Sequence, residues 1–139
     1  MQELTELSAQ ACRTFLGTSG RGRIVFTEDS LPAVASTRYV VWGDRLWFPT
    51  PARSALRHHR DGDVLAYHVD HVEVDAEAAI GDGWSVTVLG GCRAAPPGAR
   101  PQAVEEFCPQ PGGPVLALDM VQFTGRLLSA RPIPPPRTD

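Results

Sequence analysis

The sequence contains no lysine and no asparagine, and all 13 of its basic residues are arginine. The lack of lysine excludes Schiff-base catalysis, which needs a lysine amine, and also excludes the P-loop motif GxxxxGK[ST]. The two glycine-rich stretches, GTSGRGR and GDGWSVTVLGG, do not match the GxGxxG pattern that opens a helix in dinucleotide-binding domains. We therefore expect neither a P-loop nucleotide hydrolase nor a Rossmann domain.

Cysteines and long apolar runs are also scarce. Cys12, Cys92 and Cys108 are odd in number and widely spaced, unlike a secreted disulfide framework or the close pairs of a zinc site. The amino terminus carries acids where a secretory signal has bases, and no apolar run reaches the roughly 18 residues of a membrane span. The net charge is −3, with no dense arginine cluster. These features predict a soluble cytoplasmic protein with reduced thiols and without a membrane or nucleic-acid partner.

The chain length of 139 residues suits one folded domain and is too short for two. Its last segment, PIPPPRTD, is rich in proline, which lacks the N–H group that a sheet requires. We therefore expect a single domain over residues 1–131 and a proline-rich tail over residues 132–139.

Apolar spacing divides the domain into a leading helix and a series of strands. Apolar residues three to four positions apart predict an amphipathic helix between Thr5 and Gly17. Ser54 is placed to cap a short helix, ALRHHR, and a helical fragment is expected at Gln102–Phe107. Alternating or β-branched composition predicts strands over residues 23–27, 34–42, 45–50, 64–74, 84–93 and 115–128. The last strand is expected to bend near Gly125.

Most connections between these strands are too short for the crossovers that parallel strands need. The pattern therefore predicts a mostly β chain, with six antiparallel strands in a small barrel, an N-terminal helix and short helices at the rim. Trp42 and Trp47 flank the turn at Gly43-Asp44, where large aromatic side chains are expected to be covered. A dimer contact and a plain barrel core explain these two tryptophans about equally well.

Four segments, in this order, resemble the split-barrel flavin-binding family that includes the pyridoxamine 5′-phosphate oxidases, particularly its small bacterial members. They are GRIVFTED, YVVWGDRLWFPTP, GWSVTVLG and FTGRLLSA. The resemblance runs from about Gly22 to Arg126, and GWSV is its most specific part. It implies a six-stranded split β-barrel, a homodimer, and FMN held at the dimer interface.

In this family, a segment of the form T-x-x-G-S-K-L after the second hairpin strand grips the cofactor phosphate. The matching segment here provides Thr50, Arg53 and Ser54, but Ala55 stands at the lysine position. Two hydroxyl groups and the start of the short helix would favour an anion. Arg53 would replace the missing charge and bind the phosphate through two hydrogen bonds. The plain alternative is a strand end, a helix cap and a solvated arginine.

Two further residue pairs are candidate cofactor contacts. Where related sequences often read P-V-N-Y, this one reads S-T-R-Y, so that Arg38 replaces an asparagine and Tyr39 is retained. Trp84 and Ser85 of the GWSV segment are the second pair, with core packing as the plain alternative. The change at Arg38 alters which atoms of a ring or substrate are bonded, and divergent members of this superfamily bind deazaflavin or haem instead.

All four histidines, His58, His59, His68 and His71, fall within fourteen positions. A zinc site needs three or four convergent ligands, and this spacing places no three of them on one face, so we expect no metal site. An axial haem ligand requires only one histidine, and haem therefore stays open.

The leading hypothesis from the sequence is a homodimeric, FMN-dependent oxidoreductase that transfers hydride equivalents between flavin and a small organic molecule. No side chain stands out as a catalytic acid or base. One alternative is a haem-binding or haem-dependent member of the same barrel. The other is a non-catalytic protein that binds flavin or another small molecule.

Overall fold

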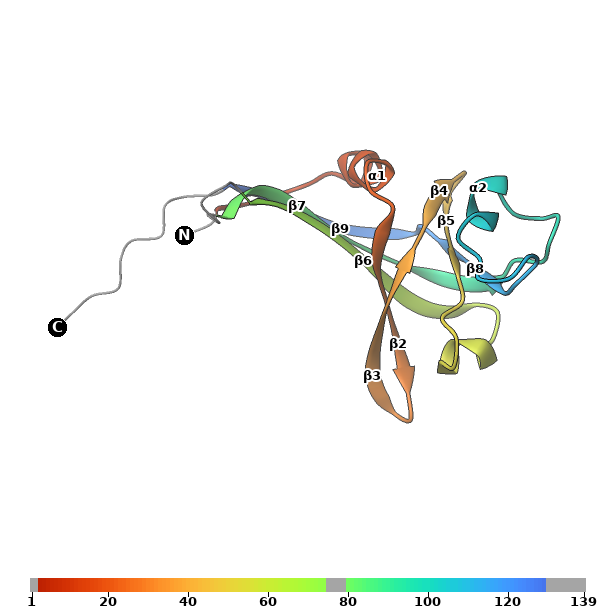
Figure 1. Ribbon diagram of the computed structural model, residues 1–139. Helices are drawn as coiled ribbons and strands as arrows, with labels where there is room; N and C mark the ends of the chain where they lie inside the picture. The colour runs from red at the N-terminus through yellow and green to blue at the C-terminus, as the bar shows by residue number, and fades with distance from the viewer. Residues whose placement is uncertain (1–2, 75–79, 130–139) are drawn as a thin grey trace.

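A computed structural model of the protein describes residues 3–74 and 80–129, and the predicted tail over residues 132–139 lies outside them. Two α-helices, one 3-10 turn and nine strands make up this part of the chain (Figure 1). The helical elements are α1 (Ala9–Gly17), η1 (Ala55–His58) and α2 (Gln102–Glu105). The strands are β1 (Glu3–Glu6), β2 (Arg21–Glu28), β3 (Leu31–Arg38), β4 (Val40–Trp42), β5 (Arg45–Pro49), β6 (Asp63–Val74), β7 (Ile80–Ala94), β8 (Val115–Asp119) and β9 (Gln122–Ser129).

All strand pairs are antiparallel, and the strands follow the order β3-β2-β6-β7-β8-β5-β4, with β9 beside β7 and β1 beside β9. Figure 1 shows a strongly curved sheet with the long β6–β7 hairpin at its centre and α2 beside β4 and β5. This curled sheet is a half-barrel, and it confirms the prediction of a mostly antiparallel split β-barrel with few helices.

The core lies inside the curve of the sheet. Its largest fully buried side chains include Tyr39, Tyr67 and Phe48, and α1 covers one end with Leu16. A smaller cluster lies around Trp47 and joins the segment after β7 to β5 and β8. Burial of each large apolar side chain contributes about 1.5–3 kcal/mol, so the inner face supplies most of the stability.

Two predicted strands are each divided in the structure. The run from residue 34 to residue 42 breaks into β3 and β4 at Tyr39, whose side chain turns into the core and whose N–H donates to the Gly20 carbonyl at 3.0 Å. The run from residue 115 to residue 128 breaks into β8 and β9 at Met120-Val121. These breaks, together with the short strand β1, account for nine strands where six were expected.

The predicted helices are shorter in the structure. Helix α1 begins at Ala9 rather than near Thr5, because Ser8 caps it by accepting a hydrogen bond from the Ala11 N–H at 3.1 Å. The helix predicted after Ser54 is a single 3-10 turn, and the Ser54 hydroxyl does not cap it. The residues before α1 instead form β1, which pairs with β9.

A two-residue turn joins β2 to β3. Its residues, Asp29 and Ser30, have φ angles of 51° and 65°, the left-handed pair that a tight hairpin turn needs. This turn fixes the register of the hairpin and places Arg21 directly opposite Arg38.

The two tryptophans at the β4–β5 turn differ in burial. Trp47 lies in the smaller core cluster and donates its indole N–H to the Trp42 carbonyl at 3.0 Å, whereas Trp42 is 58% exposed. The plain barrel core therefore accounts for Trp47 but not for Trp42, which is not covered within the single chain. No helix within the described ranges is long and apolar enough to cross a membrane.

Candidate functional site

The outer face of the sheet carries a row of polar side chains across five neighbouring strands. The register places the members of this row directly opposite one another, and they are Ser36, Arg23, His68, Thr87 and Thr124. Directly opposite residues share a face, and side chains alternate between faces along a strand. Tyr67, next to His68, is fully buried in the core, so the polar row faces outward.

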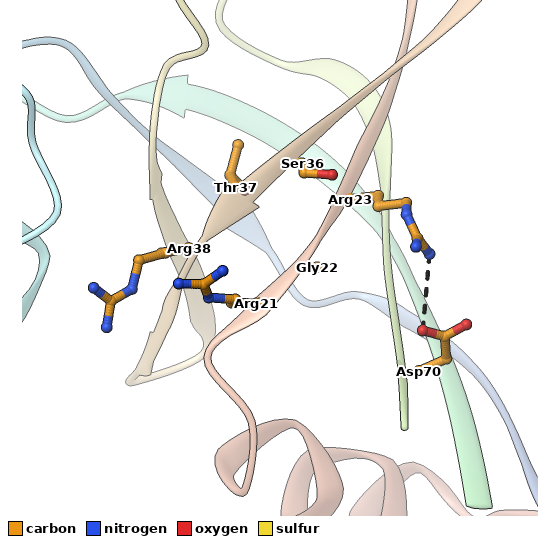
Figure 2. Close-up of a pocket in the computed structure, with 7 residues that line it drawn as sticks. All are labelled: Arg21, Gly22, Arg23, Ser36, Thr37, Arg38 and Asp70. Carbon is orange, nitrogen blue, oxygen red and sulfur yellow. Dashed lines mark ion pairs between the residues drawn. The ribbon is translucent and has the colours of Figure 1, made fainter. Parts of the chain in front are cut away.

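A cleft of about 440 Å³ opens on this outer face, and we call it the arginine cleft (Figure 2). The residues that line it come from β2, β3 and β6, and they are Arg21, Gly22, Arg23, Ser36, Thr37, Arg38 and Asp70. Its volume lies in the range of small-molecule sites. In Figure 2, Arg21 and Arg38 lie on one side of Gly22, and Arg23 lies on the other side with Asp70.

The charges of the cleft are unbalanced. Arg23 forms an ion pair with Asp70 at 3.8 Å, but no carboxylate in the described residues pairs with Arg21 or Arg38. Like charges directly opposite each other destabilise a sheet, so the Arg21–Arg38 pair costs folding free energy. The Arg38 guanidinium lies 4.2 Å from the centre of the Phe107 ring, which holds it by a cation–π contact. The cleft is therefore suited to an anionic or oxygen-rich group.

A histidine stands at the edge of the same cleft. His68 Nδ1 lies 2.9 Å from Thr87 Oγ1, and its Nε2 lies 3.7 Å from the Asp70 carboxylate. Asp70 therefore lies between Arg23 and His68 and can pair with both. His68 therefore lies on the side of the cleft that carries Asp70, held between this carboxylate and the Thr87 hydroxyl.

In each of the two residue pairs that the sequence suggests as cofactor contacts, one side chain points to the outer face of the sheet and the other into the core. Arg38 and Ser85 lie on the outer face, and Ser85 is directly opposite Asp70. Tyr39 is 2% exposed and donates its hydroxyl to the Leu16 carbonyl at 2.7 Å, and burial raises its pKa to about 12. Trp84 is 6% exposed and packs 5.1 Å from the Phe15 ring. Of these four residues, Arg38 and Ser85 reach the outer face.

In the segment suggested for the phosphate, the Ser54 hydroxyl and the Ala55 N–H already have hydrogen-bond partners within the protein. The Ser54 hydroxyl donates to the Pro51 carbonyl at 2.8 Å, and the Ala55 N–H donates to Glu28 Oε1 at 2.9 Å. Arg53 is exposed and has a φ of 58°, the conformation that glycine adopts most easily at this motif position. Thr50 is half-buried beside a separate cavity. The Ala55 amide at the start of η1 therefore already donates to a carboxylate and is not free to donate to a phosphate in this structure.

The four histidines do not gather at one point. His58 is exposed on η1, while His59 donates Nδ1–H to the Leu56 carbonyl at 3.0 Å. His68 faces outward on β6, and His71 lies three residues further along the strand, with its ring 6.3 Å from the Trp84 ring. A haem iron would therefore have only one of these four histidines as an axial ligand.

A half-barrel of antiparallel strands with a polar cleft on its outer face defines the split-barrel class. The chain belongs to the pyridoxamine 5′-phosphate oxidase family, because the model of that family matches residues 8–126. No curated protein matches the sequence.

Solved structures share the fold over nearly the whole chain. A FAD-binding protein from Mycobacterium smegmatis is 26% identical with a TM-score of 0.64, covering 90% of this chain and 98% of its own. A FAD-binding protein from Mesorhizobium loti is 18% identical with a TM-score of 0.69, covering 94% and 100%. A FAD- and haem-binding protein from M. smegmatis is 17% identical with a TM-score of 0.64, covering 96% and 76%.

Proposed function

We propose that this protein is a flavin-dependent oxidoreductase that transfers hydride equivalents between its flavin and a small organic molecule in the cytoplasm. The observation that carries the proposal is the arginine cleft on the outer face of a barrel of this family. The flavin-binding description of the M. smegmatis relative supports the same cofactor class. FMN is the form that the sequence resemblance implies, with FAD and deazaflavin as alternatives.

The flavin ring would supply the redox chemistry, and the protein would bind it, orient it and exclude water. Arg38 and Ser85 offer hydrogen-bond donors on the outer face. His68, next to Asp70, is the side chain we propose for proton exchange with a substrate at the cleft. The sequence pattern alone does not single out His68 for this acid–base role.

We also propose that a second copy of the chain covers the outer face and completes the site. A row of apolar residues, Val34, Val25 and Ala66, runs beside the polar row on this face, and Val34 is 59% exposed. A two-fold dimer through these strands would bury the apolar row and enclose a flavin lying in the cleft.

The visible spectrum of protein purified from its natural host tests the proposal. We expect the two absorption bands of an oxidised flavin, and release of the cofactor by denaturation followed by chromatography identifies its form. Ser36→Trp should fill the cleft and abolish flavin binding, whereas Gln10→Trp, a matched change at an exposed position of α1, should leave binding unchanged. Equal flavin binding by these two variants would contradict the proposed location.

Haem is the second candidate, and the specific observation for it is the exposed imidazole of His58 and of His71. A Soret band in the same spectrum would support haem, and replacement of the one ligand among the four histidines should remove that band. A colourless protein that takes up neither flavin nor haem would instead support a non-catalytic binding protein.

A further inference from the structure

The β2–β3 hairpin has opposite charges at its two ends. Arg21 and Arg38 lie at the open end, and Glu28 lies next to the turn at the other end. Glu28 and Arg21 bound the eight residues of β2, so they are about 23 Å apart at roughly 3.3 Å per residue. Because side chains alternate between faces along β2, Arg21 points to the outer face and Glu28 to the inner one, so a molecule lying in the arginine cleft meets only the positive end of the hairpin.

The Glu28 end is closed to a phosphate. Its carboxylate is half-buried and accepts the Ala55 N–H at 2.9 Å, and no arginine in the described residues forms an ion pair with it. The Ser54 hydroxyl is directed to the Pro51 carbonyl. A phosphomonoester carries about 1.5–2 negative charges at neutral pH, so it would be repelled here.

The arginine end is open to a phosphate. Arg21 and Arg38 face the same side from directly opposite positions, and each presents a guanidinium group that binds phosphate oxygens through two hydrogen bonds. Phe107 limits the freedom of Arg38, which lowers the entropic cost of binding. An anion between the two guanidinium groups would also remove the repulsion that the empty pair carries.

We propose that Arg21 and Arg38 bind the phosphate end of the cofactor, and that the Thr50–Leu56 segment does not. The inference rests on the proposed flavin function and assigns the orientation of the cofactor in the arginine cleft. It replaces the sequence-based assignment of the phosphate to Arg53 and Ser54.

Titration of each variant with FMN and with riboflavin tests the assignment, because riboflavin lacks only the phosphate. Arg21→Ala and Arg38→Ala should each weaken FMN binding by about ten- to a hundredfold and change riboflavin binding by less than about twofold. Arg53→Ala should bind both ligands as the parent does. Arg60→Ala, at another exposed arginine outside the cleft, is the matched control.

The thermal stability of each variant separates lost contacts from lost folding. Arg21→Ala removes one of two opposed like charges, so it should be at least as stable as the parent. If Arg53→Ala weakens FMN selectively and the two cleft variants do not, the assignment is overturned and the sequence-based phosphate site is restored.

Titration with inorganic pyrophosphate tests the anion site at Arg21 and Arg38 separately from the proposed flavin function. If no flavin binds the parent but pyrophosphate binds it and not Arg21→Ala, the flavin function fails and the anion site stands. If flavin binds but neither FMN nor pyrophosphate depends on Arg21 or Arg38, the anion site fails and the flavin function stands. If the parent binds neither flavin nor pyrophosphate, both are overturned.

Discussion

Two buried tyrosines make the stability of the core depend on pH. The Tyr39 hydroxyl donates to the Leu16 carbonyl, and the Tyr67 hydroxyl lies 2.7 Å from Thr37 Oγ1. Burial raises the pKa of Tyr39 to about 12 and raises that of Tyr67 further above its ordinary value. Both side chains must therefore stay protonated in the folded protein, because their charged forms are poorly solvated in the core.

The free energy of unfolding should fall as the pH rises above 10. An unfolded tyrosine loses its proton near pH 10 and folded Tyr39 does so near pH 12, so its contribution is fully present below pH 10 and is lost through this interval. Tyr39→Phe should flatten the alkaline loss and, at neutral pH, cost about 1 kcal/mol from the missing hydrogen bond. Urea unfolding at a series of pH values measures both effects, and an unchanged alkaline slope in Tyr39→Phe would contradict them.

Arg53 occupies a backbone conformation that disfavours any residue with a Cβ atom. Its φ of 58° lies in the left-handed region, where non-glycine residues pay about 1–2 kcal/mol. Arg53→Gly should therefore raise the free energy of unfolding by about 0.5–1 kcal/mol, after the entropy that glycine loses on folding. Arg53→Ala keeps the Cβ atom and is the control. Equal stability of the two variants would refute this account of the turn.

At the scale of elements, α1 is attached to the sheet through a close approach between Cys12 and Gly125. A Cβ atom at Gly125 would collide with Cys12 Sγ and would lie 3.3 Å from Leu7 Cβ. Gly125 therefore lets the helix lie directly on β9, while the Arg13 side chain joins the same helix to Asp44 in the β4–β5 turn at 3.0 Å.

Gly125→Ala should destabilise the protein by about 1–3 kcal/mol, because the added methyl group overpacks this contact. Cys12→Ala removes the sulfur that the methyl group would meet. The double variant should therefore be less destabilised than the sum of the two single variants, as measured by denaturant unfolding of all four proteins. Simple additivity would mean that the collision is relieved elsewhere, for example by a shift of Leu7.

The elements also show what the sequence could and could not predict. Alternation and turn residues predict the hairpins, and a two-residue turn at Asp29-Ser30 alone implies that Arg21 faces Arg38. The pairing of β2 with β6 could not be predicted in this way, because it depends on how separate hairpins come together. The place of Asp70 in the cleft follows from that long-range pairing. The Glu28–Ala55 contact is also long-range, and it occupies an amide donor within the segment that the local motif suggested for the phosphate.

At the scale of the whole molecule, the outer face of the sheet is exposed in the single chain. It combines the arginine cleft with exposed apolar side chains such as Val34 and Val64. Within residues 3–74 and 80–129 no helix lines the arginine cleft, and we propose a second copy of the chain as the partner of this face.

Size-exclusion chromatography with light scattering should give twice the monomer mass of 15.0 kDa. Val34→Arg should shift the protein toward the monomer, because it places a charge in the apolar row that the dimer would bury. Val121→Arg, at an exposed valine after β8, is the matched control. A concentration-independent monomer in the parent would remove the interface and with it the two-subunit cofactor site.

The pairing of β1 with β9 has a consequence for how the chain acquires its structure. The β2–β3, β4–β5 and β6–β7 hairpins are local, but β1 can pair only when the last strand is available. During synthesis, the edge of β7 that pairs with β8 and β9 would therefore remain unpaired until those two strands leave the ribosome. Contacts between distant segments slow folding, so the rate-limiting step should be the docking of β9 between β7 and β1. A chain truncated before β9 would expose that edge permanently and should aggregate rather than fold.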